Sequence, residues 1–132
     1  MPALQNLSIL DRESTPVAHV FTPRDVKDGT GLVVRSTGVP ASDEKFALSM
    51  RKSGSKFKGK ISLAVPVVQT ETINGVSRPI TVRTAYATVE FVFDEMSTTQ
   101  ERTNLVGMLA DSLGTGKTLV HETIVGLGGV YG

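Results

Sequence analysis

The sequence lacks cysteine and tryptophan altogether, and only 5% of its 132 residues are aromatic. Without cysteine there can be no disulfide, no thiolate metal site and no cysteine nucleophile. An excess of charge of one sign is also missing, since 14 Lys and Arg against 13 Asp and Glu leave a net charge of +1. Any basic binding site must therefore be local rather than a property of the whole molecule.

Long apolar runs are absent too, and residues 1–11 lack the basic start and apolar stretch of a signal peptide. We therefore expect a soluble protein that is not secreted and has no membrane partner. The length fits one domain over residues 1–132.

Motifs for catalysis are incomplete. Gly114 to Thr118 resembles the end of a phosphate-binding P-loop, but Asp111 occupies the position of the required glycine and a helical pattern precedes it. His121-Glu122 lacks the second histidine of a zinc helix, because Val125 stands there. The sequence predicts no enzyme, no metal site and no cofactor, with His19 and His121 as ordinary, partly exposed histidines. A nucleotide-binding enzyme using the segment near Gly114 remains an alternative.

Alternating apolar residues predict strands over most of the first 93 residues. The expected elements are a hairpin around the polar stretch 11–16, a strand over 32–36, an antiparallel pair over 45–51 and 57–65, a polar loop over 70–79 and a long strand over 80–93.

Period two also assigns the faces of these strands. One face takes the apolar residues Phe46, Leu48, Met50, Ile61, Leu63, Val65, Ala85, Ala87, Val89, Phe91 and Phe93. The opposite, polar face takes Lys45, Ala47, Ser49, Arg51, Lys58, Lys60, Ser62, Ala64, Thr84, Tyr86, Thr88 and Glu90.

After residue 97 the period changes to that of a helix. Thr98 and Glu101 have capping-box spacing, and an apolar stripe of Leu105, Met108, Leu109 and Leu113 runs until Gly114. A second, shorter helix is expected from Leu119 to Leu127, after a turn in which Thr118 is the N-cap. The fold class is therefore α+β: an N-terminal β-hairpin, an antiparallel sheet of about five strands and two C-terminal helices.

Two short helices cannot cover both faces of such a sheet, so the polar face should stay exposed. The open sheet edges and the helical stripe favour an intertwined dimer with one continuous sheet.

Six of the fourteen basic residues lie between positions 45 and 60, and no acid interrupts them from Arg51 to Lys60. From charge alone, this patch suits a solubilising face as well as a binding site. Strand parity adds hydroxyls and the aromatic ring of Tyr86 to the same face, which suits the phosphates and unpaired bases of RNA. Tyr86 also fits a cross-strand pair in a half-buried sheet, and that alternative stays open.

Three stretches carry a resemblance to a known family. Arg83 to Val89, the loop Thr70 to Pro79 and Ser97 to Arg102 resemble the coat proteins of the small single-stranded RNA bacteriophages, the leviviruses. The similarity spans nearly the whole chain, including the ending Gly129-Val130-Tyr131.

The resemblance implies a coat protein, a homodimer that assembles into a T=3-type icosahedral shell in the virion. It implies assembly in the host bacterial cytoplasm around single-stranded genomic RNA, with a maturation protein as a further partner. Binding of an RNA operator hairpin would repress replicase translation and direct packaging. The loop at 70–79 would take different shapes at different symmetry axes.

Carried over by position, Ser49 is the hydroxyl that contacts adenine, Arg51 the nearby arginine and Tyr86 the stacking ring, while Lys45 and Lys58 match lysines of relatives. Ala47, Ser62 and Thr88 depart from residues that some relatives have, so operator specificity is expected to differ, although Lys60 keeps a cation beside Ser62. The predicted RNA-binding residues are Lys45, Ser49, Arg51, Lys58, Lys60, Ser62, Tyr86 and Thr88. A dimeric RNA-hairpin-binding regulator that forms no particles is the alternative.

Overall fold

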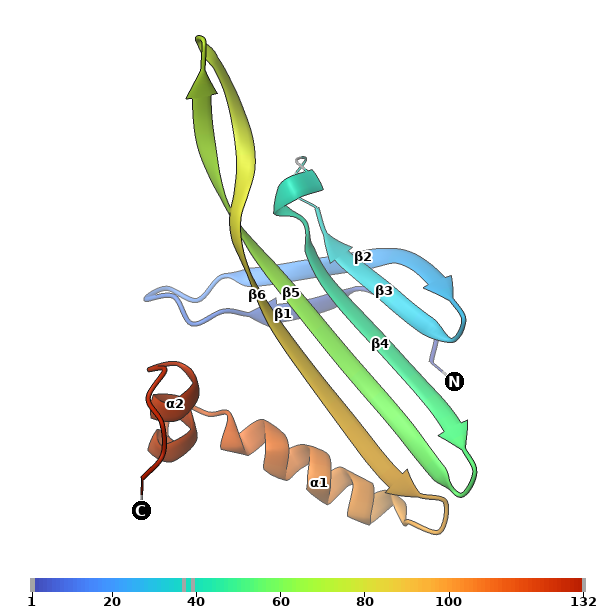
Figure 1. Ribbon diagram of the computed structural model, residues 1–132. Helices are drawn as coiled ribbons and strands as arrows, with labels where there is room; N and C mark the ends of the chain where they lie inside the picture. Colours follow the sequence, from blue (N-terminus) through green and yellow to red (C-terminus); the bar gives the residue numbers. More distant parts are fainter. Residues whose placement is uncertain (1, 37, 39, 132) are drawn as a thin grey trace. The chain divides into compact units, whose positions relative to one another are not determined.

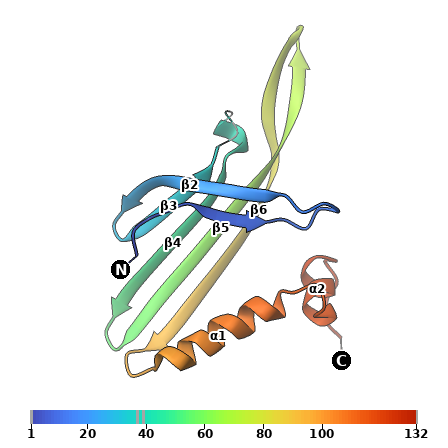
Figure 2. The same cartoon turned by 180° about the vertical axis from the view of Figure 1, so that it is seen from behind.

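The computed structural model describes residues 2–36, 38 and 40–131, and the chain falls into two compact units, 1–92 and 93–132. Among the described residues, six strands form one sheet in chain order, and two helices follow (Figures 1 and 2). The strands are β1 (Leu7–Leu10), β2 (Ala18–Lys27), β3 (Thr30–Arg35), β4 (Glu44–Ser53), β5 (Lys56–Ile73) and β6 (Val76–Asp94), with a 3₁₀ turn η1 (Pro40–Ser42) before β4. The helices are α1 (Thr99–Ser112) and α2 (Thr118–Ile124). The predicted α+β class is confirmed.

The predicted N-terminal hairpin is β1 with the first part of β2. Residues 18–21 of β2 pair with β1, whereas residues 22–27 pair with β3, and the register shifts between Pro23 and Asp25. Proline has no N–H to give to a ladder and is typical of such irregularities. The break lets one strand serve two pairings, and β1 crosses over the sheet in both views (Figures 1 and 2).

The small core of unit 1–92 lies beneath this hairpin. Phe21 and Val33 are buried, and the rings of Phe21 and Phe46 meet edge to face with centroids 6.3 Å apart. Farther along β4, Leu48 and Met50 lie on the predicted apolar face but are 50% and 55% exposed. The hairpin therefore covers only part of that face.

The predicted loop over 70–79 is wrong. β5 continues to Ile73 and β6 begins at Val76, so only Asn74 and Gly75 form the turn, and the last strand starts earlier than residue 80. Both turn residues have positive φ, 53° and 79°, which is the geometry that an Asn-Gly pair adopts in a two-residue hairpin. The residues on both sides of this turn are mostly polar, so the alternation of apolar residues used to predict strands does not reveal the hairpin.

Unit 93–132 contains both helices. The predicted capping box is confirmed, because Thr98 Oγ1 accepts from the Glu101 N–H at 3.2 Å and Glu101 Oε2 accepts from the Thr98 N–H at 3.0 Å. The prediction of Thr118 as the N-cap of α2 is wrong, because Lys117 occupies the N-cap position and makes no side-chain cap. The predicted end of this helix at Leu127 is also wrong, because α2 ends at Ile124 and Leu127 has a positive φ. Neither helix has a buried residue among those described. No helix in the described part of the chain is long and apolar enough to cross a membrane.

Candidate nucleic-acid interface

The polar face of the sheet is defined by the register of β4 and β5. Residues directly opposite each other in an antiparallel pair point to the same side of the sheet. The opposed pairs on the polar side are Lys45 with Ala64, Ala47 with Ser62, Ser49 with Lys60 and Arg51 with Lys58. The face assignment made from period two is therefore confirmed for six of the eight predicted RNA-binding residues.

The facing of β6 follows from Gly59. A Cβ added at Gly59 would lie 2.8 Å from Met50 Cε and 3.8 Å from Phe91 Cβ, so Phe91 belongs to the apolar face. Its neighbour Glu90 then points to the polar face, and alternation along the strand puts Thr88 and Tyr86 there as well.

A hollow of about 500 Å³ lies on this polar face. Five of the predicted residues line it, whereas Lys45, Thr88 and Tyr86 do not. Thr88 and Tyr86 lie two and four residues from Glu90, which lines the hollow, so they continue along β6 for roughly 7 and 13 Å at about 3.3 Å per residue. The residues that line the hollow are Thr30, Ala47, Leu48, Ser49, Arg51, Lys52, Ser53, Lys58, Lys60, Ser62 and Glu90.

Like charges face each other across the hollow. Arg51 and Lys58 are direct partners in the register, and both side chains are exposed. Such a pair is destabilising by itself, by roughly 0.2–1 kcal/mol. Arg51 Nη2 donates to the carbonyl oxygen of Asp28 at 3.1 Å, which holds the guanidinium beside the β2–β3 turn. An anion bound over this pair would remove the repulsion.

Tyr86 is 79% exposed. A half-buried cross-strand pair would leave less of the ring accessible. The 79% exposure of Tyr86 by itself favours a ring that is accessible for stacking on a base over one that packs within the sheet.

Sequence reasoning missed Thr30 as a residue of this face. Thr30 opposes Ser49 in the register and lines the hollow. The predicted strand begins at Leu32, whereas β3 begins at Thr30. No alternation of polarity indicated it, because Leu32 and Val34, which share its face, are both apolar. Lys52 is different, since its Nζ lies 5.6 Å from the centre of the Phe57 ring, a contact within the protein.

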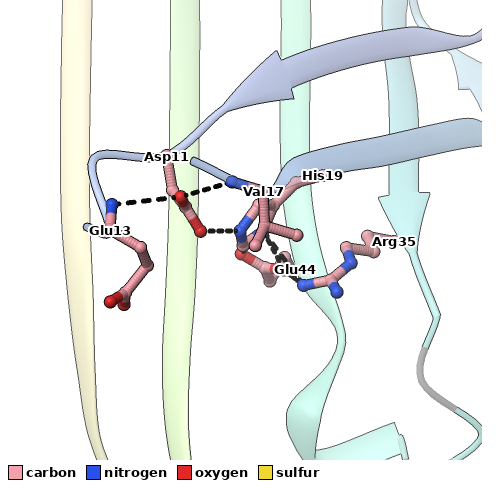
Figure 3. A network of polar contacts seen from close by, with 6 residues as sticks. All are labelled: Asp11, Glu13, Val17, His19, Arg35 and Glu44. Atoms are coloured by element: carbon pink, nitrogen blue, oxygen red, sulfur yellow. Dashed lines mark hydrogen bonds and ion pairs between the residues drawn. The ribbon is translucent and has the colours of Figure 1, made fainter. Parts of the chain in front are cut away.

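A second polar cluster ties the N-terminal hairpin to the sheet (Figure 3). His19 Nε2 lies 2.7 Å from Asp11 Oδ2, and Nδ1 lies 2.8 Å from Glu44 Oε1. Arg35 Nη1 donates to the same oxygen of Glu44, and the Glu44 side chain is only 7% exposed. Hydrogen bonds to Asp11 first and Glu44 second raise the pKa of His19 above its usual value. His19 is partly exposed, as expected, with 21% of its side chain accessible, but it is held between two carboxylates and joins β2 to β4.

The other candidate sites remain without support. The Gly114–Thr118 segment joins two helices rather than a strand and a helix, and Lys117 Nζ pairs with Asp111 Oδ2 at 3.1 Å. No group of three or more metal-ligating side chains occurs among residues 2–36, 38 and 40–131.

Comparison with known proteins assigns nearly the whole chain to one family. Residues 2–131 match the family model described as "Levivirus coat protein". The chain is 54% identical over 129 residues to the capsid protein of Pseudomonas phage PRR1, covering 97% of this chain and 98% of that protein. Its structure resembles the bacteriophage GA protein capsid, with a TM-score of 0.83, 25% identity and 98% coverage of each chain. It also resembles the chain from a virus-like particle of bacteriophage ESE058, with a TM-score of 0.84, 22% identity and coverage of 98% and 100%.

Proposed function

The chain belongs to the levivirus coat protein family, and from that premise we propose that its dimers assemble into a closed shell and bind an RNA hairpin on the polar face of the sheet. As in its relatives, the role is that of a capsid protein. The RNA bound would be the single-stranded genome, with an operator hairpin whose binding represses replicase translation and directs packaging.

Dimer formation is supported by the far edge of the sheet. β6 has 19 residues and is the last strand in the sheet order. A long open edge presents unpaired N–H and C=O groups that favour pairing with another strand. Pairing with β6 of a second copy would extend the sheet and bring two polar faces, each with a Tyr86, into one surface.

The helices support the same conclusion. α2 has only seven residues, and helices shorter than about 12–15 residues are marginal in water unless their apolar side packs on something. Leu105, Met108 and Leu113, from the predicted stripe, are all exposed in the single chain. A second copy would supply the missing surface in an intertwined dimer.

The higher assembly is proposed from family membership. Dimers would form a T=3-type icosahedral shell in the host bacterial cytoplasm, and a maturation protein would join the virion. Purified protein expressed in bacteria should therefore elute as large particles and appear as uniform closed shells by electron microscopy. Only a dimer peak across a range of salt concentrations would instead support the free RNA-binding regulator.

The observation that carries the RNA proposal is the opposed Arg51–Lys58 pair at a hollow that also holds Ser49 and Lys60. Cations there would contact phosphates, and the serine hydroxyls and Tyr86 would contact unpaired bases.

Substitutions on this face separate affinity from specificity. Lys58→Ala should weaken binding of dimers to every hairpin and lower the slope of log affinity against log salt by about 1. Ser49→Ala and Tyr86→Ala should change discrimination between loop sequences, and loss of one stacked base (~1–3 kcal/mol) predicts about tenfold weaker binding for Tyr86→Ala. Binding is measured by filter retention on dimers held below the assembly concentration.

Lys117→Ala is the charge-matched control, because Lys117 lies in the turn between the helices. This variant should bind hairpins as the wild type does. Equal, nonspecific losses in all four variants would contradict an operator site. ATP binding that Lys117→Ala abolishes would revive the nucleotide-binding alternative.

A further inference from the structure

The hollow on the polar face contains one acid. Of the described residues that line it, Glu90 alone is acidic, and the four cations are Arg51, Lys52, Lys58 and Lys60. Its side chain is exposed, and no ion pair of the described residues includes it. Glu90 therefore does not serve to hold the lysines of the hollow in the free protein.

A free carboxylate in a site for a polyanion has two opposite effects. An ionised carboxylate only accepts hydrogen bonds, so it can bind the N–H groups on the edge of an unpaired base. A phosphate offers no such donor and is repelled. The rest of the hollow is cationic, so without Glu90 it would bind backbone phosphates regardless of sequence.

We propose that Glu90 is a specificity-determining residue of the RNA face, accepting a hydrogen bond from the amino group of an unpaired base and keeping phosphates out of the centre of the hollow. This inference rests on the proposed hairpin-binding function. The loop base over Glu90 would be adenine, cytosine or guanine, because these bases have an exocyclic amino group, whereas uracil offers only its ring N3–H. Arg51, Lys58 and Lys60 would then hold the phosphates on either side of that base.

Selection from hairpins with a constant stem and a randomised loop tests the proposal. Wild-type dimers and the variant Glu90→Gln are each used to select loops. The affinities of both proteins are then measured for the loop that wild type prefers and for a loop of uridines on the same stem. Glu90→Gln should bind the uridine loop more tightly and the preferred loop more weakly. Its ratio of affinities should fall about tenfold, because the Gln amide oxygen still accepts from an amino group but forms a weaker, neutral hydrogen bond and no longer repels phosphates.

Glu71→Gln is the matched control. Glu71 lies on β5, toward the hairpin tip and away from the hollow, so the variant loses the same charge but should keep the wild-type ratio. Size-exclusion chromatography checks that both variants remain dimeric. A Glu90→Gln variant that selects the same loops with the same ratio would overturn the inference while leaving the hairpin-binding function intact. Wild-type dimers that prefer no loop would overturn both.

Discussion

Unit 1–92 and unit 93–132 differ in what stabilises them. In unit 1–92, Phe21, Val33 and Val34 are buried among the paired strands, and a buried carboxylate, Glu44, pairs with His19 and Arg35. In unit 93–132 α1 has a capping box, but α2 has no side-chain cap and neither helix buries a described residue. Helices in proteins take most of their stability from packing an apolar side. The difference indicates that the first unit is largely supported by its own contacts, whereas the second needs a surface from another copy.

The dependence of unit 93–132 on a second copy is tested by placing a charge on the apolar stripe of α1. Met108 is 71% exposed in the single chain, so Met108→Asp should be nearly neutral if the chain acts alone, within about 0.5 kcal/mol. If the stripe packs against a second copy, the substitution buries a charge and should abolish dimers and particles. Analytical ultracentrifugation and electron microscopy give the result.

Thr103→Asp is the control for Met108→Asp. Thr103 lies five residues away on α1, roughly 140° around the helix at about 100° per residue, and adds the same charge to a different side. It should form particles as the wild type does. Particles formed normally by Met108→Asp would show that the stripe is not an interface and that the two units do not differ in this way.

A pH titration tests how the His19 cluster stabilises unit 1–92. The pKa of His19 is raised by Asp11 and then Glu44, so its stabilising effect is complete below the unfolded pKa of about 6.5 and is lost as pH rises through the higher folded pKa. The pKa of Asp11 is lowered, by the Val17 N–H first and His19 second, so its contribution is lost only as pH falls through that lowered value. The hairpin should therefore be held most firmly in mildly acidic solution and loosen toward alkaline pH.

His19→Gln should lower the urea midpoint of unfolding at pH 6 and have a smaller effect at pH 9. His121→Gln removes the other histidine, which lies on α2 outside this cluster, and is the matched control. A wild-type midpoint that rises between pH 6 and 9, or an identical profile for His19→Gln, would contradict the role of this cluster. Amide exchange of residues 7–10 and 18–21 would locate the loosening in the hairpin.

The sequence predicted those features that depend on near neighbours. Alternation along 45–51 and 57–65 gave the correct faces because each strand is regular, and the capping box needed only Thr98 and Glu101. The extent of the β5–β6 hairpin was missed because Asn74-Gly75 suits both a loop and a tight turn.

Features formed by distant residues could not be predicted. The His19 cluster joins residues 8 and 25 positions apart, and no periodicity connects them. Glu90 was expected on the polar face, but its place at the hollow depends on how β6 lies beside β5, which no local pattern specifies. The roles of the eight predicted RNA-binding residues stay predictions, since the structure gives their placement and no ligand.

The smallest expected effect concerns the start of α1, where the second unit does have a contact of its own. Thr98→Ala removes the acceptor for the Glu101 N–H and should cost about 1 kcal/mol, whereas Thr98→Ser keeps the oxygen and should cost little. Thr103→Ala removes a hydroxyl that bonds back to the Thr99 carbonyl and should be close to neutral. Because α1 would pack against a second copy, the stability lost in Thr98→Ala should be measured on the dimer. The denaturant midpoint of the dimer should be lower than that of the wild type at every protein concentration. A loss of several kcal/mol from Thr98→Ala would mean that the cap, rather than the partner surface, holds the helix, and the contrast between the two units would fail.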